Sequence, residues 1–145
     1  MLILKNAQMH ELLGKYDRAL EASNNYIDYF PQDTFALYLN AKYNRLNGRY
    51  VDALETLTNL LENHPGSSRF FKERGNTYYD MELLRESIKD FSMAMDLNPS
   101  DAEIYVQRGM ARLKRGDLKG ACSDWKKGTM RGSNEAKKKM LIYCQ

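Results

Sequence analysis

Proline and glycine are scarce in this sequence: three prolines and nine glycines occur among 145 residues. So few turn-forming residues leave little room for the many short strands of a β sandwich or barrel, and they favour long helices. No run approaches the roughly 18 consecutive apolar residues that a membrane-spanning helix needs, and the opening apolar residues are too few for the core of a signal peptide. With 43% hydrophobic and 28% charged residues, the composition is that of a folded domain. We therefore expect an all-α fold without a membrane span.

Residues typical of catalytic and metal sites are scarce as well. The two histidines, His10 and His64, are far apart, and neither has a second ligand at the spacing of a helical metal site. The carboxylates of Asp80 and Glu82 are expected at a helix end and in a turn, and no glycine-rich phosphate loop is present. The sequence therefore predicts no enzyme, no metal site and no cofactor.

Positive charge is concentrated toward the C-terminal end of a chain whose formal net charge is only +3. Lysines cluster at Lys126, Lys127 and residues 137–139. A lysine run on a helix is usually its solvated face, and no nucleic-acid-reading motif accompanies this one. We do not expect a nucleic-acid partner.

The few prolines are evenly spaced, because Pro31, Pro65 and Pro99 are 34 residues apart. The same interval relates four small residues: Ala7, Ala41, Gly75 and Gly109. It also relates four turn positions: Gly14, Gly48, Glu82 and Gly116. Between these marks, apolar residues recur at three- and four-residue steps, the spacing of one helix face. Each unit is predicted to be a helical hairpin whose helices approach closely at the small residue, with a turn between the helices and a proline after the second.

These marks resemble the tetratricopeptide repeat, a 34-residue helical hairpin. The third unit resembles it most, through Phe71, Arg74, Gly75, Tyr78, Ser87, Phe91, Ala94 and Pro99. The resemblance implies a right-handed superhelix of helix-turn-helix hairpins, a TPR-like α-solenoid. It divides the chain, as a single domain, into four repeats and a capping helix: 1–33, 34–67, 68–101, 102–133 and 134–145. The apolar stripe of the capping helix is expected to comprise Ala136, Met140, Leu141 and Tyr143.

The resemblance also implies a function, that of a non-catalytic scaffold which binds a peptide or protein segment in a concave groove. By register, the peptide-binding residues would be Tyr38, Lys42, Arg45, Arg69, Lys72, Asn76, Tyr79, Gln107, Met110 and Lys114. The register adds Phe35, Glu73 and Val106 to the same groove. Aromatic rings, amides and cations suit the apolar side chains, backbone and acids of an extended segment. The alternative is that these are ordinary exposed helix residues.

A clamp that grips the C-terminal carboxylates of a peptide in this family is matched only in part. Lys72 and Asn76 occupy its first two places, and Gln107 replaces the asparagine at the third. Lys137 falls at the fourth place, but Leu141 stands where an arginine belongs. We therefore do not expect this chain to bind a chaperone tail through such a clamp.

The two ends of the chain carry further expectations. The first helix would begin at Met1 with no capping residue ahead of it, as in a piece of a longer protein or a chain whose Met1 replaces an upstream repeat. Its open face could dock on a second copy or on the rest of a parent chain, which makes self-assembly the alternative function.

The tail from Cys122 to Cys144 resembles the ending of many bacterial tetratricopeptide proteins, in which such a cysteine pair recurs in exported chains. The resemblance implies a disulfide between Cys122 and Cys144, and two reduced thiols are the alternative. A disulfide would favour the bacterial periplasm or envelope over the cytoplasm, although the sequence alone leaves the compartment unknown.

Overall fold

The computed structural model describes residues 1–145 and contains nine α-helices and no strand. In chain order the helices are α1 (Leu2–Leu12), α2 (Tyr16–Tyr29), α3 (Thr34–Leu46), α4 (Tyr50–Asn63), α5 (Ser68–Asp80), α6 (Leu84–Leu97), α7 (Ala102–Lys114), α8 (Leu118–Met130) and α9 (Asn134–Tyr143). The prediction of an all-α fold built from helical hairpins is confirmed.

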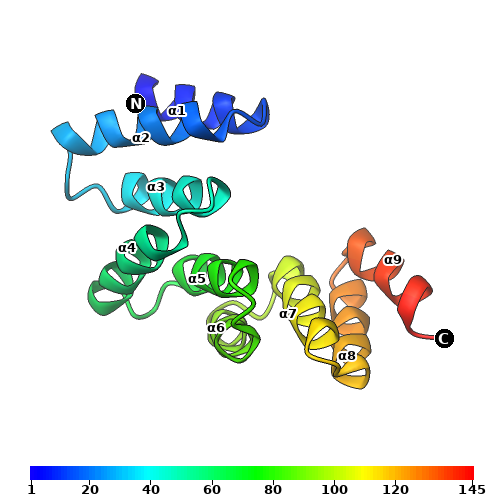
Figure 1. The fold of residues 1–145 in the computed structure, drawn as a ribbon. Coiled ribbons are helices and arrows are strands. Elements are labelled where there is room, and N and C mark those ends of the chain that lie inside the picture. The colour runs from blue at the N-terminus through cyan, green and yellow to red at the C-terminus, as the bar shows by residue number, and fades with distance from the viewer. The chain divides into compact units, whose positions relative to one another are not determined.

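The chain divides into two compact units, Met1–Pro65 with α1 to α4 and Gly66–Gln145 with α5 to α9 (Figure 1). We call them unit 1 and unit 2. Within unit 1, α2 packs against α1 and α3, and α3 also packs against α4. Within unit 2, each helix packs against the next one in the chain. The grouping of the four repeats into a single domain stays a prediction.

The turns inside the hairpins depend on left-handed backbone. Gly14, Gly48 and Gly116 have φ angles of 68°, 75° and 92°. The third hairpin places Glu82 at this position with φ 63°, and it is the only residue other than glycine with a positive φ. Because a side chain crowds its own backbone in this conformation, Glu82 is strained where glycine is not.

Side-chain caps start the first helix of each later hairpin and the last helix. The caps are Asp33, Ser67, Asp101 and Ser133, each of which accepts a hydrogen bond from a backbone N–H of the first turn. Asp33 accepts from the N–H groups of Phe35 and Ala36 and from the hydroxyl of Tyr26, each at 3.0 Å. The hydrogen bond from Ala36, followed by that from Tyr26, lowers the pKa of the Asp33 carboxyl.

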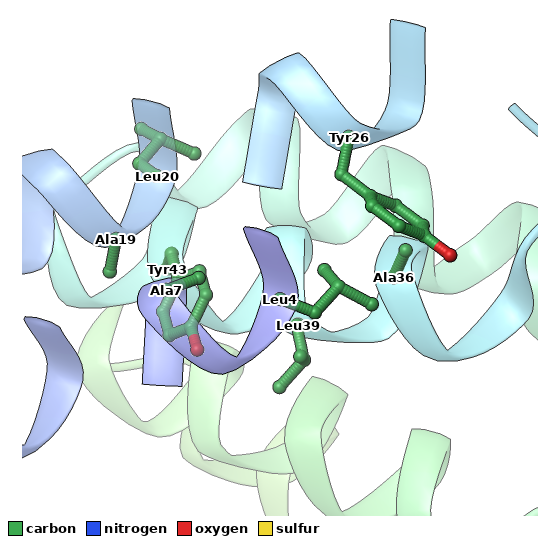
Figure 2. Packing of buried hydrophobic residues seen from close by; sticks show 8 residues of the cluster. All are labelled: Leu4, Ala7, Ala19, Leu20, Tyr26, Ala36, Leu39 and Tyr43. Carbon is green, nitrogen blue, oxygen red and sulfur yellow. The ribbon is translucent and has the colours of Figure 1, made fainter. Parts of the chain in front are cut away.

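The core of unit 1 is made by apolar side chains from α1, α2 and α3, which Figure 2 shows at close range. Its buried members are Leu4, Ala7, Ala19, Leu20, Tyr26, Ala36, Leu39 and Tyr43. The Tyr43 ring is fully buried, and its hydroxyl donates a hydrogen bond of 3.2 Å to Glu11. Burial, followed by the negative charge of Glu11, raises the pKa of Tyr43.

The core of unit 2 relies on large rings that pack against glycines. A Cβ atom at Gly75 would lie 2.8 Å from the Phe91 ring, and one at Gly109 would lie 2.3 Å from Nε1 of Trp125. Both rings are almost completely buried. The small residues of the 34-residue pattern therefore allow the close approach of the two helices in these hairpins.

The last helix, α9, covers the end of unit 2 through one narrow face. Ala136 is buried and Met140 is half-buried, whereas Leu141 is 67% exposed. The expected place of Leu141 in the apolar stripe was wrong, because five residues after Ala136 correspond to a rotation of about 140° around a helix. A disulfide joins Cys122 in α8 to Cys144 just after α9, with Cα atoms 5.8 Å apart.

Candidate functional site

A pocket of about 230 Å³ lies between α5 and α7 in unit 2. We call it the α5–α7 pocket. Its lining residues are Asn76 and Tyr79 from α5, Phe91 from α6, and Val106, Gln107 and Met110 from α7. Four of these residues are among those predicted to bind a peptide, and Val106 was expected in the same groove.

Local helix geometry explains how these side chains meet. Asn76 and Tyr79 are three residues apart on α5, and Val106 and Met110 are four apart on α7, so each pair shares a helix face. Val106 and Met110 also pack against the buried cluster of Ala121, Trp125 and Ala136. In addition, Nε1 of Trp125 donates a hydrogen bond of 3.3 Å to the Val106 carbonyl. The α7 wall of the pocket is therefore fixed by the core behind it.

The floor of the pocket is Phe91, which is 1% exposed. The sequence identified Phe91 only as a residue of the repeat pattern and did not predict its place in the pocket. The available signal was Gly75, since a glycine facing a ring lets that ring come close to the opposite helix. The first helix of the third repeat thus approaches Phe91 directly beside Asn76.

Two amide side chains supply the polar groups of the pocket. Gln107 donates a hydrogen bond of 3.2 Å from Nε2 to Glu103, while its Oε1 is buried without a hydrogen-bond partner. A buried acceptor that lacks a donor is costly, so an N–H group from a ligand would relieve it. Asn76 lies on the opposite helix, so hydrogen-bonding groups stand on both sides of the pocket.

The lysines at the two ends of the pocket are engaged by carboxylates of the chain itself. Lys72 Nζ lies 3.0 Å from both Asp101 and Glu103. Burial lowers the pKa of Lys72, but the hydrogen bonds to Asp101 and Glu103 outweigh it, and the pKa is raised overall. These ion pairs replace the free cation that the sequence analysis expected here.

At the other end, Lys114 pairs with Glu82 at 2.5 Å, and its ammonium group lies 4.8 Å from the centroid of the Tyr79 ring. The hydrogen bond to Glu82 raises the pKa of Lys114. Lys114 therefore sits over the aromatic wall of the pocket, with its charge balanced by a carboxylate.

The remaining predicted residues lie elsewhere. Tyr38, Lys42 and Arg45 are on α3 in unit 1, where Lys42 forms an ion pair with Glu11. Arg69 is exposed at the start of α5 and does not line the pocket. Glu73 is 4% exposed, so its expected place on an open groove was wrong.

The structure shows no group of three or more His, Cys, Asp or Glu side chains that could hold a metal ion. None of its helices is both long and apolar enough to cross a membrane.

Paired helices of nearly constant length, joined by left-handed turns, define a helical-hairpin repeat protein. Residues 7–68 match the tetratricopeptide repeat family. The rest of the chain repeats the same helical hairpin, and its fold is that of solved tetratricopeptide repeat proteins. No curated protein matches the chain in sequence.

Several solved structures share the fold at low sequence identity. A thermophilic TPR protein of Thermus thermophilus is 21% identical with a TM-score of 0.87, and the match covers 97% of this chain and 80% of that one. MamA from Desulfovibrio magneticus RS-1, from residue 41 onward, is 22% identical with a TM-score of 0.77, over 89% of this chain and 73% of that one. The first TPR of Spaghetti (RPAP3), bound to the HSP90 peptide SRMEEVD, is 21% identical with a TM-score of 0.71, over 77% of this chain and 90% of that one. At these identities the solved structures show a shared fold.

Proposed function

We propose that the chain is a non-catalytic interaction module that binds a peptide or protein segment at the α5–α7 pocket. The observation that carries this proposal is the pocket itself, which combines a ring floor, apolar walls and two amides within about 230 Å³. A similar fold bound to a peptide, in the first TPR of Spaghetti (RPAP3), supports a ligand of this kind.

The pocket suits one large apolar side chain of the ligand. Phe91, Val106 and Met110 provide the apolar surface, and full burial of a Leu, Met or Phe side chain contributes about 1.5–3 kcal/mol. The Asn76 amide and the unpartnered Oε1 of Gln107 would then bind the ligand backbone on either side. In this arrangement the apolar side chain of the ligand provides the affinity, and the amides of Asn76 and Gln107 fix the orientation of the ligand.

The charges around Lys72 favour an internal segment over an acidic C-terminal tail. Lys72 already serves two carboxylates, Asp101 and Glu103, so this group of three side chains has a net negative charge. A terminal carboxylate placed there would meet repulsion and would have to displace an existing ion pair. The ligand is therefore anchored by its apolar side chain.

Selection from a phage library of random linear peptides, followed by NMR titration of the chain with an enriched peptide, tests the proposal. Enriched peptides should share a Leu, Met or Phe, and the side-chain amide signals of Asn76 and Gln107 should shift. The peptide SRMEEVD is the matched acidic-tail control and should bind more weakly. Failure to enrich any peptide, or shifts confined to residues outside the pocket, would contradict the proposal.

A second candidate function is self-association through α1, which exposes an unusual number of apolar side chains. Met1, Leu2 and Leu12 are 84%, 85% and 82% exposed, and Met9 is 55% exposed. Such a surface is typical of a contact between proteins. Light scattering should then show a mass that rises with protein concentration, and Leu2→Glu should restore the monomer mass. A wild-type protein that stays monomeric at all concentrations would exclude this function.

A further inference from the structure

A second pocket, of about 740 Å³, lies in unit 1 between the start of α3 and the second half of α4. We call it the α3–α4 pocket. Its apolar surface comes from Pro31, Leu37 and Leu60, and its polar surface includes Thr56, Asn59, Asn63 and His64. No Lys, Arg, Asp or Glu lines it. In a chain with 28% charged residues, this composition favours a neutral ligand.

The 34-residue period shows what fills the same place in another hairpin. Tyr105, in the hairpin of α7 and α8, is two periods after Leu37 and is buried. Its hydroxyl donates a hydrogen bond of 3.1 Å to the Pro99 carbonyl. The guanidinium carbon of Arg131 lies 4.3 Å from the centroid of the Tyr105 ring. In that hairpin the place is therefore filled by Tyr105, and Arg131 covers the ring.

The equivalent residues in unit 1 leave the place open. Leu37 is shorter than tyrosine and has no hydroxyl, so it cannot donate to the Pro31 carbonyl as Tyr105 donates to that of Pro99. Asn63, two periods before Arg131, donates a hydrogen bond of 2.9 Å to the Asn59 carbonyl and cannot extend over a ring as an arginine does. The α3–α4 pocket, of about 740 Å³, thus has room for a tyrosine ring beside the Pro31 carbonyl.

We propose that the α3–α4 pocket binds a tyrosine side chain of a partner protein. The ring would pack on Leu37 and Leu60, and the phenol would donate to the Pro31 carbonyl as Tyr105 does to Pro99. The Asn59 amide at the rim is suited to the partner's backbone. Because no Lys, Arg, Asp or Glu lines the pocket, no such side chain there can pair with the charges of free tyrosine, which is a zwitterion, or of phosphotyrosine. All lining residues lie in unit 1, so this inference does not depend on the α5–α7 pocket.

NMR titration of the whole chain with N-acetyl-tyrosinamide, which mimics a tyrosine within a peptide, tests this site. Saturable shifts are expected at Thr56, Asn59 and Asn63, with a Kd on the order of 1 mM for so small a probe. N-acetyl-phenylalaninamide, which lacks the hydroxyl, should bind about fivefold more weakly. Free tyrosine and the phosphorylated probe should produce no saturable shift.

Two variants make the test specific. Leu37→Tyr copies the fourth hairpin and should abolish binding by filling the pocket from within, with a raised Tm. Asn63→Arg is the second variant, should Leu37→Tyr fail to fold, and should also abolish binding by covering the pocket. Met93→Ala, at a methionine of α6 that lines neither pocket, is the control and should bind the probe as wild type does. The proposal is overturned if wild type shows no saturable shift, or if a folded variant binds the probe with unchanged affinity.

Discussion

Units 1 and 2 build the same type of helical hairpin with different side chains at equivalent positions. The small residue of the first helix is Ala7 and Ala41 in unit 1, but Gly75 and Gly109 in unit 2. Sixteen residues later in each hairpin, the buried residues are Ser23 and Leu57 in unit 1, but Phe91 and Trp125 in unit 2. The smallest residue on the first helix, glycine, is therefore paired with the largest residues on the second. Close packing of the two helices does not require the same residues, only a compensating pair.

The polar contacts of the two units differ in the same way. In unit 2, Arg74 pairs with Asp90 and Arg108 pairs with Asp124, each at 2.7 Å. In unit 1, Asn40 stands at the equivalent position and donates hydrogen bonds to Ser23 at 2.9 Å and Asn24 at 2.6 Å, which link α3 to α2. At these positions unit 2 thus uses buried charges, and unit 1 uses neutral groups that tolerate the loss of a partner better.

Removal of a buried charge should expose this difference most strongly. Asp124 is completely buried and accepts hydrogen bonds from both Arg108 and Arg112. Asp124→Ala should destabilise the protein by about 3–5 kcal/mol, because two guanidinium groups lose their counter-charge. Urea denaturation measures the loss, and hydrogen exchange should locate it in unit 2. Thr56→Ala, at the equivalent position of unit 1, is the control and should cost less than about 1 kcal/mol.

Reduction of the disulfide should weaken unit 2 alone. Cys122 and Cys144 are 22 residues apart, and cross-linking a loop of that size contributes about 3 kcal/mol. Hydrogen exchange should become faster in α8 and α9 after reduction and stay unchanged in unit 1, which contains no cysteine. Mass spectrometry of the protein from its native compartment should also find no free thiol. A count of two free thiols would show that the disulfide does not form there.

Crowding the close helix contact should have an intermediate effect. Gly75→Leu should cost about 1–3 kcal/mol, since even a Cβ atom there lies 2.8 Å from Phe91. Gly66→Leu is the matched control, because no atom lies within 4 Å of a Cβ at that position. Thermal unfolding should separate the two variants clearly. An unchanged melting temperature for Gly75→Leu would show that α5 and α6 do not approach as described.

The strained turn should give the smallest effect, and a stabilising one. Glu82→Gly should raise the free energy of unfolding by about 0.5–1 kcal/mol, because glycine adopts the left-handed backbone without strain. The lost pair between Glu82 and Lys114 is largely exposed and offsets little of this gain. Gly48→Glu introduces the same strain in unit 1 and should destabilise by a similar amount. Equal stability of all three proteins would argue against strain at Glu82.

Much of the fold was predictable because it depends on local rules. The interval between Pro31 and Pro65 marked one hairpin, and the small residues Ala41 and Gly75 marked the places where two helices approach closely. The sequence also places Glu82 at the turn position that is glycine in the other three hairpins, and the strain occurs there. Leu141 was misplaced because apolar character alone does not fix the angle around a short terminal helix.

The candidate site was predictable only in part. Register alone brought Asn76, Tyr79, Gln107 and Met110 together, because the repeat period fixes the face that each residue occupies. The ion pairs of Lys72 with Asp101 and Glu103 depend on contacts between α5 and the start of α7, which the sequence does not reveal. The same limit applies to the α3–α4 pocket, whose lining brings together Leu37 from α3 and Asn63 from α4.

Binding of a selected peptide to two matched variants tests the role of the α5–α7 pocket most directly. Met110→Lys puts a charge into the pocket, whereas Met93→Lys changes a methionine on α6 that is 39% exposed and outside the pocket. Calorimetric titration should show affinity at least about tenfold lower for Met110→Lys, a loss of roughly 1.4 kcal/mol, and unchanged affinity for Met93→Lys. Equal affinity of both folded variants would contradict a role for the pocket in binding.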